Sequence, residues 1–303
     1  MNRIPVILDV DTGIDDALAI LLARSCEQLT IIGIACVSGN VSVEDTYRNT
    51  RFIAHKLELK VPVAKGAAYP MANKILHAPD EHGLHGLGRL KIEVEAEKHI
   101  LPASQLYIKL LTEAIEPITI IATGPLTNLA HLIINHPELK PKIKTISFMG
   151  GSLDGGNVTK TAEYNAYADP EALNVILKSE IPLIMAGLNL TRKIKIQTKD
   201  LKITDPTPVQ QIYIDLLDFY CETAAKHGNV DGGELNDSMA VAAVAMPETF
   251  VSELKGIQVD VSKGDTRGET KPSDEFKNVL VLTSTDIKAM VKLTVESIRH
   301  LRS

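Results

Sequence analysis

The chain has 303 residues, of which 45% are hydrophobic and 23% are charged. This composition is ordinary for a globular protein with a substantial core. The net charge of −6 and the lack of a long basic run argue against a nucleic-acid partner. No apolar stretch suits a signal peptide or a membrane span, and the three cysteines show no CxxC spacing. We therefore expect a cytoplasmic protein with free thiols and no membrane contact.

Through about the first two-thirds of the chain, short apolar runs alternate with segments of helical periodicity. This alternation is typical of βα units on a mostly parallel sheet. Strands are expected at residues 6–10, 30–37, 61–64, 118–122, 145–149 and 181–186. Helices are expected at residues 14–25, 43–57, 102–114, 126–135 and 169–178. A long loop rich in Gly and His runs to about residue 98, and residues 150–168 are too polar and Gly-rich for core structure.

The pattern changes in the last third of the chain. Helices are predicted at residues 206–226, 238–245 and 285–301, with strands and turns over 256–282. No linker rich in Pro, Gly or Ser interrupts the chain, so a single domain over residues 1–303 is the simplest organisation. The predicted fold class is α/β, with a mostly parallel central sheet flanked by helices, of the doubly wound open-sheet type.

Four carboxylates follow one another at the end of the first predicted strand: Asp9, Asp11, Asp15 and Asp16. Strand periodicity places Asp9 and Asp11 on the same side, and Gly13 permits a tight turn into the next helix. Ligands of open α/β sheets bind beyond the carboxyl ends of the strands. Carboxylates crowded there would repel one another unless a cation neutralised them.

Helix capping is the alternative explanation for this acidic segment. Asp15 and Asp16 could simply favour the start of a helix, but capping does not explain Asp9 and Asp11 within an apolar strand. A metal site is therefore the better interpretation. With no Cys or His nearby, the ligands are hard oxygens, which favour Ca²⁺ or Mg²⁺ over zinc.

Two enzyme families carry an Asp-x-Asp strand end that resembles this one. In the haloacid-dehalogenase phosphatases, Asp9, Asp11 and Thr12 would match the nucleophile, the acid and the following Thr. The longer string Asp-Val-Asp-Thr-Gly-Ile-Asp-Asp-Ala closely resembles the signature of the nucleoside hydrolases. The longer match favours the second family.

Further segments similar to the nucleoside hydrolases occur in that family's order along nearly the whole chain. They lie at residues 37–40, 82–88, 122–130, 149–151, 156–157, 162–165, 169–172, 187–191 and 236–237. Alone, each could be an ordinary turn, a helix cap or a set of surface histidines. Their joint occurrence, each after a predicted strand, favours the family. One departure is Asn189, where the family pattern has Asp.

The resemblance implies a calcium-dependent hydrolase that splits ribonucleosides into ribose and free base. It implies that Asp11, Asp16, the carbonyl of Thr123 and Asp237 hold Ca²⁺. Calcium accepts six to eight oxygens, which leaves positions for the ribose hydroxyls and for water. Asp11 would then be the general base that accepts the proton of the attacking water. Asp9 would support these ligands without binding the metal.

The same resemblance implies which residues bind the small-molecule substrate. The implied contacts are Asp15, Asn40, Asn157, Glu163 and Asn165 for the sugar hydroxyls, Met149 for the sugar ring, and His82 for the base. Such contacts would select ribose over deoxyribose, because a missing hydroxyl leaves buried partners unpaired. A homodimer or homotetramer and a role in nucleoside salvage are also implied.

The sequence departs from the family at the residue that assists the leaving base. Asn236 occupies the catalytic position where many members have a His, and an amide cannot deliver a proton. The remaining candidates are His82, His85, Tyr220 and His227. We expect pyrimidine ribosides to be preferred, because their base can leave with charge on a carbonyl oxygen.

Two rival functions stay open from the sequence. Asn236 also suits a non-catalytic homologue that only binds nucleoside or ribose. A dehalogenase-type phosphatase would need a Lys and a second acidic pair on later strands. Lys193 and Lys195 are present, but no Asp-Asp pair follows Asp16.

Overall fold

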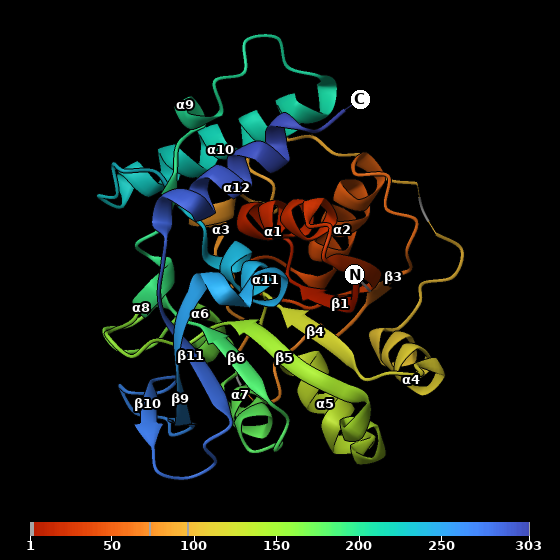
Figure 1. Cartoon of the computed structure of the whole chain (residues 1–303), viewed down its shortest axis with the longest axis vertical. Coiled ribbons are helices and arrows are strands. Elements are labelled where there is room, and N and C mark those ends of the chain that lie inside the picture. The colour runs from red at the N-terminus through yellow and green to blue at the C-terminus, as the bar shows by residue number, and fades with distance from the viewer. Residues whose placement is uncertain (1–2, 73, 96, 303) are drawn as a thin grey trace.

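The computed structural model describes residues 3–72, 74–95 and 97–302. Its centre is a nine-stranded sheet in the order β10-β9-β11-β6-β5-β4-β1-β2-β3 (Figure 1). The strands from β11 to β3 run parallel, while β9 is antiparallel to both β10 and β11. The nine strands are β1 (Ile4–Val10), β2 (Leu29–Cys36), β3 (Val63–Lys65), β4 (Ile118–Ala122), β5 (Ile143–Met149), β6 (Leu183–Ala186), β9 (Phe250–Val259), β10 (Thr270–Ser273) and β11 (Val279–Thr285). A separate antiparallel pair consists of β7 (Lys195–Ile196) and β8 (Gly233–Glu234).

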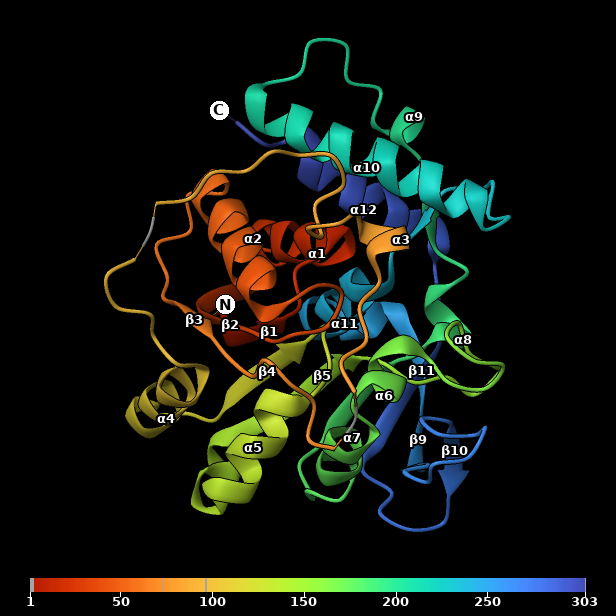
Figure 2. The same cartoon turned by 180° about the vertical axis from the view of Figure 1, so that it is seen from behind.

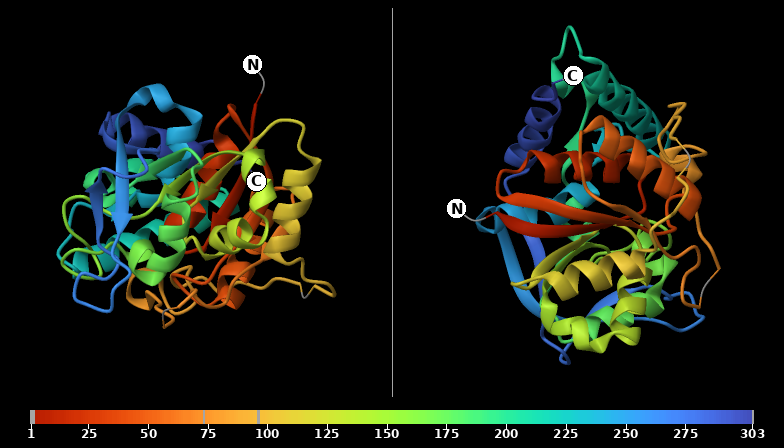
Figure 3. Two further views of the ribbon diagram at one scale, coloured as in Figure 1. Left: turned by 90° about the horizontal axis from the view of Figure 1, so that it is seen from below. Right: turned by 90° about the vertical axis from the view of Figure 1, so that its right-hand side faces the viewer.

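Helices cover both faces of the sheet, as the right-hand view of Figure 3 shows. The helices are α1 (Ile14–Ser25), α2 (Val43–Lys56), α3 (Pro79–His82), α4 (Ala103–Glu113), α5 (Thr127–Asn135), α6 (Tyr164–Ala168), α7 (Pro170–Leu177), α8 (Leu188–Thr191), α9 (Thr198–Leu201), α10 (Pro208–Lys226), α11 (Asn236–Ala245) and α12 (Ile287–Arg299). Two 3₁₀ helices are η1 (Pro137–Lys142) and η2 (Pro247–Thr249). One layer contains α1, α2, α10, α11 and α12, and the other contains α4, α5 and α7 (Figure 2).

Side-chain alternation along β1 divides the core between these two layers. Val6, Leu8 and Val10 belong to the hydrophobic cluster that includes α1, α10 and α11, whereas Ile7 belongs to the cluster of α4, α5 and α7. A strand buried on both faces reads as a continuous apolar run, as this one does. Helix α1 is buried at ten consecutive residues, Ile14 to Ala23, because it lies between the sheet and the outer helices.

The predicted fold class is confirmed, and the periodic segments form the expected elements within a few residues. The structure also differs from the prediction in several elements. The polar segment 150–168 contains helix α6, because the Glu163 carboxylate caps it by accepting from the N–H groups of Asn165 and Ala166. The loop before residue 98 contains the single turn of α3. Strand β9 begins at Phe250, earlier than predicted, because the exposed residues of its first half carry no core pattern.

The parallel arrangement brings the carboxyl ends of β1, β2, β4, β5 and β6 to one edge of the sheet. The segments that follow these strands carry most of the predicted site residues, so the topology gathers them at this edge. Among the helices of the described residues, none has the length and hydrophobicity needed to cross a bilayer.

Candidate active site

A cavity of about 580 Å³ opens at the carboxyl edge of the parallel strands. Its walls come from the segments after β1, β2, β4 and β5, from α3, and from the ends of α10 and α11. All predicted site residues except Asp16 line it, namely Asp11, Asp15, Asn40, His82, Thr123, Met149, Asn157, Glu163, Asn165, Asn236 and Asp237. The volume is typical of a pocket for a small organic ligand.

A cluster of buried carboxylates lies at the floor of this cavity. Asp15, Asp16 and Asp237 each offer a carboxylate oxygen, and these atoms lie within 4.8 Å of one another. Burial, and then the neighbouring carboxylate of Asp15, raise the pKa of Asp16 to about 6. Burial and the three nearby aspartates raise the pKa of Asp237 as well. A donor set made only of oxygen, with excess negative charge, fits a hard divalent cation.

Asp16 does not itself line the cavity. Its buried carboxylate accepts four hydrogen bonds from the neighbouring loops. Oδ1 accepts from the backbone N–H of Asp11 at 3.2 Å and from the Thr123 hydroxyl at 2.6 Å. Oδ2 accepts from the N–H of Gly13 at 2.9 Å and from the Asn40 amide at 3.1 Å. These donors belong to the segments after β1, β2 and β4, so one side chain connects three loops.

The carboxylate of Asp11 is clamped between two glycine-containing loops. Its Oδ2 accepts the backbone N–H of Asn40 at 2.8 Å. A Cβ at Gly39 would lie 2.0 Å from Oδ2, and one at Gly124 would lie 2.9 Å from Oδ1. Burial, followed by the charge of Asp16, raises the pKa of Asp11. The group is therefore well placed to accept a proton once a cation offsets the surrounding charge.

Only two of the four predicted metal ligands lie in the carboxylate cluster, and the other two make different contacts. Asp16 and Asp237 lie in the carboxylate cluster, and Asp15, which the sequence assigned to ribose, completes it. The Thr123 carbonyl accepts from the Asn165 amide at 2.7 Å. Asp11 lines the same cavity but turns its Oδ2 toward Asn40.

Asp9 faces a different environment from Asp11. It is 1% exposed and accepts hydrogen bonds from the Tyr107 hydroxyl and, at 3.1 Å, from the Asn128 amide. Burial raises its pKa to about 7. Among the described residues that line the cavity Asp9 is absent, and its support of the metal ligands stays a prediction.

The wall after β5 carries the polar groups assigned to the sugar. The Glu163 carboxylate accepts from the N–H groups of Gly151 at 2.8 Å, Asn165 at 2.8 Å and Ala166 at 3.0 Å. Burial raises its pKa to about 7. Within the described part of the chain, Asn165 Oδ1 is a buried acceptor without a hydrogen-bond partner. This wall therefore offers a rigid carboxyl group and an unused acceptor.

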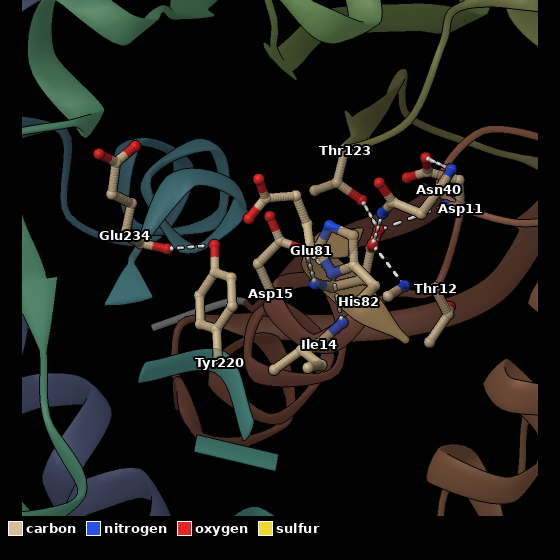
Figure 4. Close-up of polar contacts among 12 residues, drawn as sticks. Asp11, Thr12, Ile14, Asp15, Asn40, Glu81, His82, Thr123, Tyr220 and Glu234 are labelled. Carbon is tan, nitrogen blue, oxygen red and sulfur yellow. Dashed lines mark hydrogen bonds and ion pairs between the residues drawn. The ribbon is translucent and has the colours of Figure 1, made fainter. Parts of the chain in front are cut away.

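The opposite wall carries His82 and Tyr220. His82 Nδ1 accepts the backbone N–H of Ile14 at 3.2 Å, which leaves the ring proton on Nε2. Burial lowers the pKa of His82, so the neutral ring is favoured. The Tyr220 ring stacks on it with centroids 6.0 Å apart, and its hydroxyl donates to the Glu234 carbonyl at 3.0 Å (Figure 4).

Several residues that line the cavity were not predicted as site residues. Glu81, Glu234 and His77 line the cavity, and so does His227, which the sequence offered only as a possible acid. Charged residues next to the His82 and Asn236 motifs were a signal for Glu81 and Glu234. By contrast His85, another candidate acid, has a side chain that is 62% exposed, pairs with Asp45 and is absent from the cavity lining.

Comparison with known proteins shows the family to which the chain belongs. The sequence pattern of the family of inosine-uridine preferring nucleoside hydrolases matches residues 6–292 of this chain. The chain belongs to this family. As a nucleoside hydrolase, it is an N-glycosyl hydrolase, and the match includes the strand end that it shares with the dehalogenase phosphatases.

Relatives that are named for different substrates resemble this nucleoside hydrolase. The pyrimidine-specific ribonucleoside hydrolase RihA of Photobacterium profundum is 36% identical over 99% of this chain and 100% of its own length. A purine-preferring ribonucleoside hydrolase from Gardnerella vaginalis is 30% identical, with a TM-score of 0.88 over 97% of this chain and 98% of its own. The plant nucleoside hydrolase PpNRh1 is 26% identical, with a TM-score of 0.93 over 99% and 100%.

Proposed function

We propose that this nucleoside hydrolase cleaves the N-glycosidic bond of ribonucleosides in a calcium-dependent reaction, with pyrimidine ribosides preferred. The observation that carries the proposal is the buried cluster of Asp15, Asp16 and Asp237 beside Asp11 in a ligand-sized cavity. Binding of a divalent cation would relieve the repulsion that raises the pKa values of these groups.

Asp11, Asp16, the Thr123 carbonyl and Asp237 would hold the calcium ion, with Asp15 close by. When bound, calcium would polarise water and neutralise the carboxylates. Asp11 accepts the proton from the water that attacks the anomeric carbon, and the clamp from Asn40 and the two glycines keeps its carboxylate in place. Because the transition state carries positive charge on the ribose, the surrounding carboxylates also stabilise it.

The sugar binds between the two walls of the cavity. Asp15 belongs to the carboxylate cluster and the Asn40 amide donates to Asp16 of the same cluster, which supports contacts of both residues with the 2′- and 3′-hydroxyls. Asn157, Glu163 and Asn165 lie on the wall after β5, where Met149 also faces the cavity. The unpartnered Asn165 Oδ1 supports a hydrogen bond from a sugar hydroxyl. A deoxyribonucleoside leaves such groups unpaired and is disfavoured.

The base lies against the wall of His82 and Tyr220. The Nε2–H of His82 can donate to the carbonyl oxygen next to the glycosidic nitrogen of a pyrimidine, on which charge develops as the base leaves. This donor supports pyrimidine ribosides, and the likeness to a pyrimidine-specific relative agrees with it. We also propose that the enzyme acts in cytoplasmic nucleoside salvage as a homodimer or homotetramer.

Reducing sugar released from a panel of ribonucleosides, with and without a strong chelator, tests the proposal. We expect release from uridine and cytidine above that from purine ribosides, loss of activity with the chelator, and recovery with calcium. Metal analysis of the treated protein accompanies the assay, so that retained metal is detected. Full activity in protein shown to be metal-free would contradict the calcium dependence. Binding of nucleosides without release of sugar would support the non-catalytic alternative.

A further inference from the structure

The leaving base needs a proton or a strong donor, and the usual position for an acid holds Asn236. As the C1′–N bond breaks, its electron pair stays on the base nitrogen. Two of the candidates already have other roles. His82 is held neutral by burial, with Nδ1 accepting a backbone N–H. Burial raises the pKa of the Tyr220 hydroxyl well above its usual value, and that hydroxyl donates to the Glu234 carbonyl.

A pair of facing side chains lies on the same side of the cavity. His227 follows the last residue of α10, and its Nδ1 lies 2.8 Å from Oε1 of Glu81 on α3. Both residues line the cavity. The Thr223 hydroxyl donates to the Glu81 carbonyl at 3.2 Å, so a second contact joins the same two segments. The pair therefore connects α3 and α10 beside the place where the base is bound.

The charges around this pair come from several elements. Glu81 acts electrostatically on Asp15 from α1, on His82 and on Glu234 from β8, which places its carboxylate near the base-binding wall. Lys226 precedes His227 and acts on Glu222 of the same helix. In Figure 4 the carboxylates of Glu81 and Glu234 lie on opposite sides of the Tyr220 hydroxyl. Glu81 and Glu234 therefore both line the cavity near Tyr220, on the wall where we place the base.

We propose that His227, oriented by Glu81, is the general acid that protonates the leaving base. This inference rests on the proposed hydrolysis of ribonucleosides. Nδ1 is engaged by Glu81, so Nε2 is the nitrogen that serves the base. The Nε2 of His227 gives its proton to the base as the C1′–N bond breaks, while Glu81 holds Nδ1 in place. The water oxygen forms the new bond to C1′, and its proton passes to Asp11.

The His227 side chain is exposed to solvent and that of His82 is not, and a general acid needs access to water to regain its proton. The His227 side chain is 51% exposed and that of Glu81 is 43% exposed. After each turnover the neutral ring can therefore take a proton from water, whereas His82 is buried. His77 also lines the cavity, but its Nδ1–H donates to the Gly39 carbonyl at 2.8 Å. Because Gly39 is packed against Asp11, His77 belongs to the side of the cavity that holds the attacking water.

The test compares substrates whose leaving groups depend to different degrees on a proton. Inosine depends on it most and uridine less, whereas the phenolate of 4-nitrophenyl β-D-ribofuranoside leaves as a stable anion without it. We expect His227→Gln to lower kcat for inosine by about 100- to 10,000-fold, the usual contribution of a general acid, and kcat for uridine by a smaller factor. The phenyl riboside should change by no more than about threefold. Glu81→Gln should show the same substrate pattern with a smaller loss.

The matched control is His85→Gln, which changes a histidine that follows α3 and pairs with Asp45 outside the cavity. It should leave all three substrates at the wild-type rate. Equal losses on nucleosides and phenyl riboside in His227→Gln, or no loss on either, would overturn the assignment. A wild-type enzyme that cleaves only the phenyl riboside would also overturn it, while leaving the hydrolytic site intact. No cleavage of any riboside would instead refute the proposed function itself.

Discussion

Asp11 shows how local packing can prepare a single carboxylate for proton transfer. The side chain is 1% exposed, and its pKa is raised by burial and by Asp16. Its position depends on the Asn40 N–H and on the absence of side chains at Gly39 and Gly124. The residue identity supplies the acceptor, and the neighbouring loops fix where it lies.

Asp11→Asn should therefore remove most of the activity and leave the fold intact. The amide keeps the size of the side chain and can still accept from Asn40, but it cannot take a proton from water. We expect kcat on uridine and inosine to fall by about 100- to 10,000-fold. Release of reducing sugar measures the rate, and thermal unfolding checks the fold. Wild-type turnover by a folded variant would show that Asp11 is not the base.

Gly39→Ala should act on the same carboxylate indirectly. The added Cβ would lie 2.0 Å from Asp11 Oδ2, so the short, clamped side chain has to move. A displacement of about 1 Å in a catalytic group can cost 100-fold in rate. Gly264→Ala is the matched control, because its Cβ would meet nothing closer than 3.5 Å. Equal kcat values for the two variants would contradict this reading of the clamp.

At the scale of elements, Asn128 at the start of α5 joins parts of the sheet beneath the site. Its amide donates to Asp9 of β1 at 3.1 Å and to the Cys36 carbonyl of β2 at 3.0 Å. Its Oδ1 accepts the N–H of Ala67, just after β3, at 2.8 Å. One buried side chain thus satisfies polar groups from three neighbouring parts of the sheet.

Asn128→Ala should destabilise the protein by about 2–4 kcal/mol, because it leaves buried donors and acceptors unpaired. The matched control is Asn135→Ala on the same helix, whose amide donates to the His131 carbonyl at an exposed position. Urea unfolding of the metal-free proteins measures both free energies. A loss in Asn128→Ala no greater than in Asn135→Ala would contradict the role of Asn128.

The sequence predicted the helices and strands better than the contacts between them. Apolar runs and helical periodicity placed the sheet, the flanking helices and the acidic strand end, because these patterns are local. Helix α6 escaped prediction because the Glu163 side chain caps it while binding Gly151, a contact that periodicity does not reveal. The Glu81–His227 pair also escaped prediction, because only the packing of α3 against α10 brings these residues together.

For the whole molecule, the buried carboxylates make metal-free stability depend on pH. Burial raises the pKa values of Asp9 and Glu163 to about 7 and those of Asp15 and Asp16 to about 6, all above their unfolded values. The folded state therefore holds more protons than the unfolded chain between about pH 4 and 7. The stability that these protons supply is complete at the lower end of this range and is lost as the pH rises through it.

Without metal, the unfolding temperature should therefore fall as the pH is raised from about 5 to 7.5, since each pKa unit corresponds to about 1.4 kcal/mol. Calcium should reverse the fall, because the cation takes over the role of the protons at the aspartate cluster. Thermal unfolding with chelator or with calcium across this range measures both effects. A metal-free protein that becomes more stable up to pH 7.5 would contradict the expectation.

The four hydrogen bonds to Asp16 limit which residues can occupy this position at all. Both carboxylate oxygens receive two donors each, from Asp11, Thr123, Gly13 and Asn40. An asparagine of the same shape would turn its NH₂ group toward one of these donor pairs, so two hydrogens would meet head-on. Even the most conservative replacement would loosen three loops together. The hydrogen bonds to the loops alone thus require a carboxylate at position 16, with or without a bound ion. Loss of activity in an Asp16 variant would therefore not show that Asp16 binds the metal.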